Sequence, residues 1–219
     1  GLGTVGVGVV KLLSQQADLI SQRSGRDIVV TNVSARDSTK DRNINLSGIN
    51  WSNNPLEMAV SQDVDVVIEL IGGHSGIAKE LVESAIINGK HVVTANKALI
   101  AHHGTELAQL AEQANVAIAF EAAIAGGVPI VKALREGLAG NKILRVFGIL
   151  NGTCNYILSE MRQTGKDFDL ILKEAQDLGY AEADPTFDVE GIDTAHKLAI
   201  LTSLAFGSEL NFNSVHIEG

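Results

Sequence analysis

The feature that most constrains this chain is the alternation of short apolar runs with helix-forming segments over its first half. The run 64–71 (VDVVIELI) is almost continuously apolar, which is typical of a strand covered on both faces of a sheet. Further strand-like runs follow at 91–95 and 116–121, and the intervening segments 77–88 and 104–114 have helical spacing. Strands that alternate with helices predict a parallel sheet with crossover connections. The fold class is therefore expected to be α/β, with a doubly wound parallel sheet.

The chain opens on a glycine pattern, with Gly1, Gly3 and Gly6 in the spacing G-x-G-x-x-G. A helix-like apolar run follows at 7–13, and a run rich in β-branched residues lies at 27–34. Such a turn lets the backbone approach a pyrophosphate, whose charge then lies at a helix N-terminus. We therefore predict a Rossmann-type dinucleotide site whose first strand, expected before the glycines, is missing. The alternative is that the glycines form a flexible terminus.

The polar residues after the run 27–34 bear on the choice of cofactor. Arg36 and Asp37 stand side by side there, ahead of an asparagine-rich stretch at 38–54 that is predicted to be loop. An arginine at this point accommodates the 2′-phosphate of NADP, whereas an acid accepts hydrogen bonds from the ribose hydroxyls of NAD. Arg36 comes first and is the better placed, so NADP is favoured over NAD. The alternative is a surface ion pair in a loop.

The pattern changes near residue 126, and we predict a domain boundary there. Residues 1–126 form the predicted nucleotide-binding domain, and residues 127–219 form a domain for substrate binding, catalysis and dimerisation. In this second domain, helical segments at 168–178 and 193–204 accompany one strand-like apolar run at 143–150 (ILRVFGIL). The second domain is accordingly expected to be α+β, and its apolar run could supply a dimer surface.

Charge and cysteine content exclude some classes of protein. The formal net charge of -9 argues against a nucleic-acid-binding role, because a phosphate backbone attracts basic surfaces. The single cysteine permits no intrachain disulfide and is typical of a reducing cytoplasm. The apolar stretches are too short and too often interrupted to span a membrane. The first residue is Gly1 rather than methionine, so the natural start is expected to be missing.

A set of motifs carries a resemblance to a known family. In chain order they are 1–6 (GLGTVG), 94–97 (TANK), 151–158 (NGTCNYIL) and 179–197 (GYAEADPTFDVEGIDTAHK). On these motifs the chain resembles homoserine dehydrogenase along its whole length, and the last two motifs are highly specific. Members of that family are longer at the C-terminus, where the chain returns to the nucleotide-binding domain, and many bacterial members carry a regulatory domain beyond. The sequence is therefore expected to be a fragment trimmed at both ends.

The resemblance implies an activity, the reduction of L-aspartate 4-semialdehyde to L-homoserine with NAD(P)H, on the route to threonine, methionine and isoleucine. It also implies a cytoplasmic enzyme that is typically a homodimer. Lys197 matches the catalytic lysine, and Asp193 matches its acidic neighbour. Lys97 matches a second lysine beside the nicotinamide and the substrate. Glu182 matches a carboxylate that holds the substrate amino group, and Asp188 is expected to assist it.

The resemblance further implies ligand sets for a cofactor and a cation. The residues expected to contact NADP or NAD are Gly1, Gly3, Thr4, Val5, Gly6, Arg36, Ile71, Gly72 and Lys97. The residues expected to hold a monovalent cation, sodium or potassium, are Glu121 and, through their backbone carbonyls, Ile124, Gly126 and Val128. Oxygen-only ligands suit a hard ion, although an ordinary hinge between domains explains the glycines equally well.

Without the family resemblance, Lys197 and its neighbours support hydride transfer to an aldehyde less directly. Hydride addition to an aldehyde places negative charge on its oxygen, so a cation or proton donor must lie close by. Asp193 and Lys197 are four residues apart on one helical face, so the carboxylate can orient the ammonium. Exposed pairs of this spacing are common and contribute little. The apolar run 198–201 indicates a largely buried helix, which favours the functional reading. The acids at 182–193 are equally compatible with a solvated loop.

Two rival interpretations stay open. A semialdehyde dehydrogenase could use Cys154 as a thiol nucleophile, because this residue lies near the start of a predicted helix, where thiolates are stabilised. No histidine base is recognisable for it. A non-catalytic nucleotide-sensing module would keep the cofactor fold but would need no lysine in its cleft. Lys97 and Lys197 therefore discriminate between an enzyme and such a module.

Overall fold

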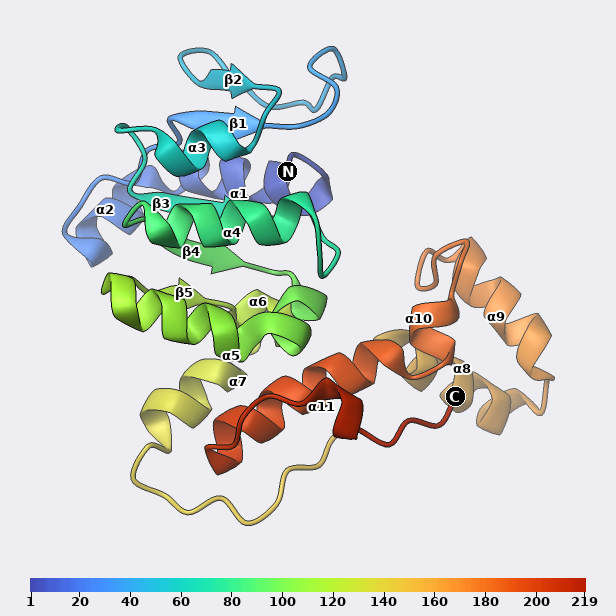
Figure 1. Ribbon diagram of the computed structural model, residues 1–219. Helices are drawn as coiled ribbons and strands as arrows, with labels where there is room; N and C mark the ends of the chain where they lie inside the picture. The colour runs from blue at the N-terminus through green and yellow to red at the C-terminus, as the bar shows by residue number, and fades with distance from the viewer. The chain divides into compact units, whose positions relative to one another are not determined.

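The protein divides into two compact units. The computed structural model describes all residues from 1 to 219, with one unit at residues 1–127 and the other at residues 128–219. Figure 1 shows helices layered against parallel strands in the first unit, so the predicted α/β fold is confirmed. None of the helices combines the length and the apolarity that crossing a membrane requires.

Three strands form the main sheet of the first unit. They are β3 (Val66–Glu69), β4 (His91–Thr94) and β5 (Ile118–Ala119), all parallel and in the order β3-β4-β5. Each lies within a predicted apolar run, and alternate residues of β3 and β4 are buried. Glu69 lies opposite Thr94 in the register, so the carboxyl ends of these two strands coincide. Open α/β sheets bind ligands at this end of their strands.

A separate parallel sheet pairs β1 (Asn32–Ser34) with β2 (Asn50–Ser52). β2 lies inside the stretch 38–54 that the sequence predicts to be loop, so that part of the prediction is wrong. Asparagine and serine have little preference for strands. The strand forms because its backbone pairs with β1 and because Trp51 packs against the apolar cluster that includes Val33.

Helices complete the first unit. Their bounds are α1 (Thr4–Gln15), α2 (Ala17–Ser24), α3 (Leu56–Val60), α4 (Ile77–Ile87), α5 (Lys97–Ala114) and α6 (Glu121–Ile124). α4 packs against β3 and β4 and lies between α3 and α5 (Figure 1). α5 begins earlier than the predicted segment 104–114, because Asn96 caps it: its Oδ1 accepts from the backbone N–H of Leu99 at 3.1 Å.

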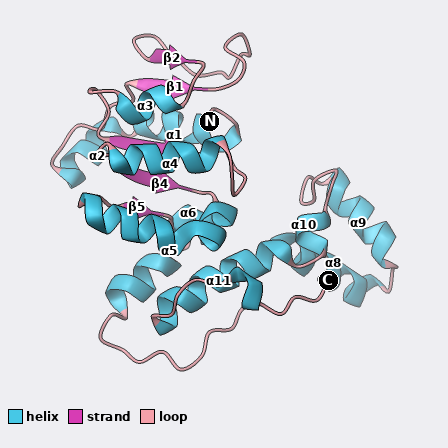
Figure 2. Cartoon of the chain, in the orientation of Figure 1, coloured by secondary structure: helices cyan, strands magenta, loops and turns pink.

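The second unit contains helices and loops but no strand (Figure 2). Its elements are α7 (Ile130–Lys132), the π-helix η1 (Ala133–Gly137), α8 (Gly152–Thr164), α9 (Phe168–Asp177), α10 (Thr186–Val189), α11 (Ile192–Phe206) and the 3-10 helix η2 (Phe212–Ser214). α8 and α9 pack on each other around buried Ile157, Ile171 and Ala175. The helices predicted at 168–178 and 193–204 are confirmed.

The run 143–150, which the sequence predicts to be a strand, pairs with no other strand. Leu144, Phe147 and Ile149 in this run are 80%, 84% and 78% exposed. A strand needs a neighbour to satisfy its backbone N–H and C=O groups, and the second unit offers no strand edge. The strand prediction is wrong for this run, and the second unit is helical where α+β was expected.

Candidate functional site

The glycine turn of the first unit has the geometry of a dinucleotide-binding loop. A Cβ atom on Gly1 would collide with the backbone carbonyl oxygen of Leu70, and one on Gly6 would collide with the carbonyl oxygen of Gly1. A Cβ on Gly3 would point into open space, with no further residue within 4 Å. α1 begins directly after Gly3, with no acidic residue in its first turn. Glycine is thus required by packing at the outer positions, while the middle position leaves room for a pyrophosphate at the helix N-terminus.

The loop after β1 organises the acid and the arginine that bear on cofactor choice. Oδ1 of Asp37 accepts from the hydroxyl of Thr39 at 2.7 Å and from its backbone N–H at 2.8 Å, and these bonds lower the pKa of Asp37. Arg36 is exposed beside it. Arg42, which the sequence did not single out, donates to the carbonyl of Asp37 at 2.7 Å and to that of Leu2 at 3.1 Å. One carboxylate oxygen of Asp37 is therefore occupied within its own turn.

The remaining predicted cofactor residues lie at helix starts and strand ends of the first unit. Thr4 and Val5 are exposed in the first turn of α1. Ile71 and Gly72 follow β3, and their backbone N–H groups donate to a carboxylate oxygen of the residue that ends that strand, at 2.6 and 3.1 Å. Lys97 is the first residue of α5 and is half-buried. All of these positions follow the carboxyl end of a strand or the glycine turn.

The second unit contains a cavity of about 480 Å³. Its walls are formed by Asn151, Gly152, Thr153, Tyr156, Tyr180, Asp188, Asp193 and Lys197. Among these, only Asp188, Asp193 and Lys197 are predicted site residues. The wall thus combines an ammonium, two carboxylates, an amide and hydroxyl groups, which suits a small ligand that carries charged and polar groups.

Lys197 is held in this cavity by two hydrogen bonds. Its Nζ donates to Oδ2 of Asp193 at 2.7 Å and to the backbone carbonyl of Leu150 at 2.8 Å. The side chains of Lys197 and Asp193 are 17% and 7% exposed, so the pair is not the solvated surface pair that spacing alone allowed. An ammonium has three donors, and the third is left for a ligand.

Asn151 connects the two carboxylates of the cavity. Its Nδ2 donates to Oδ1 of Asp188 at 2.7 Å and to Oδ2 of Asp193 at 3.0 Å. Its Oδ1 accepts from the backbone N–H of Cys154 at 2.8 Å and so caps α8. Sequence reasoning recognised a helix-entry turn at Asn151 and missed its second role. The sequence around Asn151 indicates only the helix cap, because Asp188 and Asp193 are distant from Asn151 in the sequence.

Family models match nearly the whole chain. The model described as the NAD binding domain of homoserine dehydrogenase matches residues 1–121, and the homoserine dehydrogenase model matches residues 129–219. The chain belongs to the homoserine dehydrogenase family.

Individual relatives agree with this assignment. A homoserine dehydrogenase of Neisseria gonorrhoeae is 54% identical over 219 residues, which are 100% of this chain and 50% of that protein. The crystal structure of a homoserine dehydrogenase from Thiobacillus denitrificans superimposes with a TM-score of 0.95 at 52% identity, over 100% of this chain and 50% of that one. A hyperthermophilic archaeal homoserine dehydrogenase in complex with NADPH gives 0.67 at 28% identity, over 92% of this chain and 60% of that one. The chain thus spans about half the length of the curated relatives it matches.

The acids expected to bind the substrate of a homoserine dehydrogenase are divided between the cavity and the surface. Asp188 lines the cavity, whereas Glu182 is exposed and is not among the lining residues. The backbone carbonyl of Glu182 accepts from Nε2 of Gln176 at 3.1 Å. Asp184 caps the next turn through Thr186, and this contact lowers the pKa of Asp184. The structure therefore brings Asp188, Asp193 and Lys197 together and leaves Glu182 apart from them.

Cys154, the nucleophile of the rival semialdehyde dehydrogenase, is in surroundings that disfavour a thiolate. Its Sγ donates to the backbone carbonyl of Asp188 at 3.1 Å. Burial raises the pKa of the Cys154 thiol, and the nearby charges of Asp188 and Asp193 raise it further. A nucleophilic cysteine needs the opposite surroundings, with a lowered pKa and a cation close by. The homoserine dehydrogenase interpretation is therefore the better supported one.

The residues expected to hold a monovalent cation lie at and just after α6. Glu121 begins this helix and Ile124 ends it. The backbone carbonyls of Ile124 and Gly126 accept no hydrogen bond from another backbone N–H group, while that of Val128 accepts from Ile130 at 2.8 Å. Carbonyl oxygens without a donor are suitable ligands for a hard cation.

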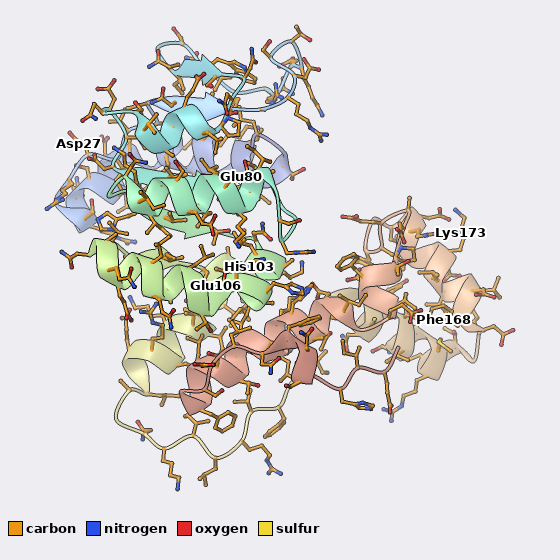
Figure 3. All side chains as sticks on the ribbon, in the orientation of Figure 1. Asp27, Glu80, His103, Glu106, Phe168 and Lys173 are labelled. Carbon is orange, nitrogen blue, oxygen red and sulfur yellow. The ribbon has the colours of Figure 1, made fainter.

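Histidines of the first unit gather near the loop after β3. The ring centroids of His74 and His102 are 4.6 Å apart, and those of His74 and His103 are 6.4 Å apart. Burial lowers the pKa of His102, and its two histidine neighbours lower it further. Nδ1 of His103 lies 3.4 Å from a carboxylate oxygen of Glu106, one turn along α5 (Figure 3). No group of three or more His, Cys, Asp or Glu side chains is arranged to hold a metal ion.

Proposed function

We propose that this chain supplies the cofactor-binding and substrate-binding parts of an NAD(P)H-dependent homoserine dehydrogenase, which reduces L-aspartate 4-semialdehyde to L-homoserine. The observation that carries the proposal is the Lys197 ammonium, which is bound to Asp193 at 2.7 Å in the wall of a polar cavity. A nucleotide-sensing module would have no use for a half-buried lysine with one donor left for a ligand. Membership of the homoserine dehydrogenase family supports the same substrate class.

In the proposed mechanism, Lys197 stabilises the negative charge that develops on the aldehyde oxygen and donates a proton to it. Asp193 and the carbonyl of Leu150 keep the lysine in one orientation, so little reorganisation is needed in the transition state. Nicotinamide, when bound, supplies the hydride. The family resemblance assigns the substrate ammonium group to Glu182, with Asp188 assisting. Of these two acids only Asp188 lines the cavity, so we propose that Asp188 is the primary contact and that the exposed Glu182 has the lesser part. Lys97, in the first unit, would lie beside the nicotinamide as a second lysine of the site.

We propose that the cofactor lies on the glycine turn and is NADP rather than NAD. The glycine turn, Thr4 and Val5 would bind the pyrophosphate, and Ile71 and Gly72 would contact the nicotinamide half. Arg36 would bind the 2′-phosphate, because it is exposed while Asp37 uses one carboxylate oxygen within its own turn. The archaeal relative in complex with NADPH supports the same choice.

A monovalent cation, sodium or potassium, is proposed at Glu121 with the carbonyls of Ile124, Gly126 and Val128. The carbonyls of Ile124 and Gly126, which accept no backbone hydrogen bond, fit such an ion, and its role would be to order the segment after α6. In the full-length enzyme, exchanging sodium or potassium for the bulky tetramethylammonium ion at constant ionic strength should lower the Tm. An unchanged Tm would remove the cation from the proposal.

We propose a cytoplasmic homodimer formed through the second unit. The exposed side chains of Leu144, Phe147 and Ile149 form an apolar row on the unpaired run 143–150. A second copy of this run could cover the apolar side chains and could pair with the backbone N–H and C=O groups of the run. A monomer in sedimentation of the full-length protein would count against the dimer.

Turnover by the full-length enzyme tests the proposed function. Oxidation of NADPH is followed by absorbance after L-aspartate 4-semialdehyde is added, and the reverse reaction is followed with L-homoserine and NADP. An enzyme of the proposed class turns over both substrates. Binding of NADPH without turnover would instead support the nucleotide-sensing module.

A further inference from the structure

A buried carboxylate at the end of β3 takes no part in the proposed chemistry. Glu69 is 0% exposed and is the last residue of its strand. Its Oε1 accepts from the backbone N–H groups of Ile71 at 2.6 Å and Gly72 at 3.1 Å, and its Oε2 accepts from the hydroxyl of Thr94 at 2.6 Å. All three donors are uncharged. A buried carboxylate is tolerated only when donors replace its water, and here they do.

The hydrogen bonds of Glu69 continue into the next strand and helix. Oγ1 of Thr94 accepts from the backbone N–H of Asn96 at 2.9 Å. Nδ2 of Asn96 donates to the carbonyl of Gly73 at 2.7 Å, while its Oδ1 caps α5 at Leu99. The bonds therefore form a closed ring that leads from Glu69 to the loop at 71–73 and returns through Asn96 and Thr94. This ring is called the Glu69 clamp below.

The Glu69 clamp holds two segments that are otherwise poorly constrained. Gly72 and Gly73 have φ values of 89° and 82°, a region that only glycine adopts freely, so their loop has many alternative conformations. Lys97 stands at the first position of α5, where a loose cap would let the helix start fray. Both segments lie at the carboxyl end of the sheet.

We propose that Glu69 is a positioning residue for the cofactor site, through the Glu69 clamp. It aims the loop at 71–73 and the start of α5, with Lys97, at the place where the nicotinamide half of the cofactor binds. This role rests on the function proposed above. The residue itself touches no ligand, and a neutral side chain cannot replace it fully. Glutamine keeps one acceptor for Ile71 and Gly72, but its amide nitrogen can only donate to the Thr94 hydroxyl, so this bond is reversed and the hydroxyl hydrogen loses its acceptor.

The test uses the full-length enzyme with Glu69→Gln, Thr94→Val and the double variant. Glu69→Gln disturbs and Thr94→Val removes the same link between β3 and β4, so each should raise the Kd for NADPH, Thr94→Val by about tenfold, and the double variant should be no weaker than Thr94→Val alone. Thr94→Ser keeps the hydroxyl and should restore the affinity. Val67→Ala is the matched control, since Val67 is buried in the same strand but belongs to no clamp bond.

A merely structural role predicts a different pattern. All variants, including Val67→Ala, would then lower the Tm while the Kd for NADPH stayed within about twofold of the wild type. That result, or additive effects in the double variant, overturns the proposal. Should Glu69→Gln fail to fold, Thr94→Val and its rescue by Thr94→Ser carry the same comparison.

Amide hydrogen exchange tests the Glu69 clamp independently of the proposed function. If the wild type binds no NADPH, the proposed function fails, and exchange still tests the clamp. The amides of Ile71, Gly72 and Asn96 should exchange faster in Thr94→Val than in the wild type, while Val67→Ala leaves them unchanged. Unaltered exchange at these amides overturns the proposal.

Discussion

Two buried carboxylates, one in each unit, accept hydrogen bonds from different kinds of donor. Glu69 in the first unit is 0% exposed and receives only uncharged donors, two of them backbone N–H groups. Asp193 in the second unit is 5% exposed and receives the Lys197 ammonium at 2.7 Å and the Asn151 amide at 3.0 Å. Neutral donors from the backbone let a carboxylate fix the course of the chain. A charged side-chain donor lets it hold a group that can take part in chemistry.

The same contrast extends to the surfaces offered to ligands. The first unit presents backbone: a glycine turn, a helix N-terminus and a loop that is held in place by hydrogen bonds to Glu69. The second unit presents side chains around a cavity. Substitutions in the first unit should therefore act on cofactor affinity, and substitutions in the second on substrate and turnover. In the full-length enzyme, the Kd for the cofactor reports the first effect, and kcat and KM report the second.

The largest effect is expected from Lys197→Ala. Loss of the proposed proton donor should lower kcat by about 10² or more, because general acid catalysis typically contributes that much. The Kd for NADPH should not change, because the lysine belongs to the unit that is proposed to bind the substrate. Lys197→Arg should not rescue kcat, since a guanidinium does not give up a proton near neutral pH. Steady-state kinetics and a fluorescence titration with NADPH measure the two quantities. A near-normal kcat in Lys197→Ala would remove this residue from the mechanism.

The next effect concerns cofactor choice. Arg36→Ala should weaken the binding of NADPH by roughly ten- to hundredfold and leave the binding of NADH unaffected. The reason is that a charge-assisted contact with a phosphate contributes about 1.5 to 3 kcal/mol. Arg23→Ala, which removes another exposed positive charge, on α2, is the control for general electrostatic effects. If the ratio of NADPH to NADH affinity stays the same in Arg36→Ala, Arg36 does not face the 2′-phosphate.

A smaller effect on both cofactors is expected at the glycine turn. Gly3→Ala places a methyl group in the open space proposed for the pyrophosphate. It should therefore weaken the binding of NADPH and of NADH alike, by roughly tenfold or about 1.4 kcal/mol. Its Tm should stay close to that of the wild type. Gly6→Ala should instead lower the Tm, because its Cβ meets the carbonyl of Gly1. Equal Tm losses in the two variants would show that the turn has only a packing role.

The smallest effect separates the two roles of Asn151. Serine is as good a helix cap as asparagine, so Asn151→Ser should keep α8 and the Tm. It cannot bridge Asp188 and Asp193, and the KM for homoserine should rise roughly fivefold, the equivalent of about 1 kcal/mol for one hydrogen bond. A KM that does not move would limit Asn151 to capping.

The sequence by itself determined the features that depend on neighbours along the chain. Apolar periodicity located β3, β4 and the long helices, because burial of one face imposes its spacing on the residues. The glycine turn and the pairing of Asp193 with Lys197 also follow from local geometry, since residues four apart meet on a helix. The family motifs lie on these same local features.

Only the tertiary structure decided which distant residues meet. Asn151 reaches Asp188 and Asp193 across 37 and 42 residues, and Thr94 reaches Glu69 across 25. No local pattern encodes such contacts, because the packing of whole elements brings the side chains together. The same reason explains the errors: β2 became a strand because β1 offered an edge, and the run 143–150 did not because no edge was available in its unit. A strand depends on its partner, and the partner is supplied by the fold.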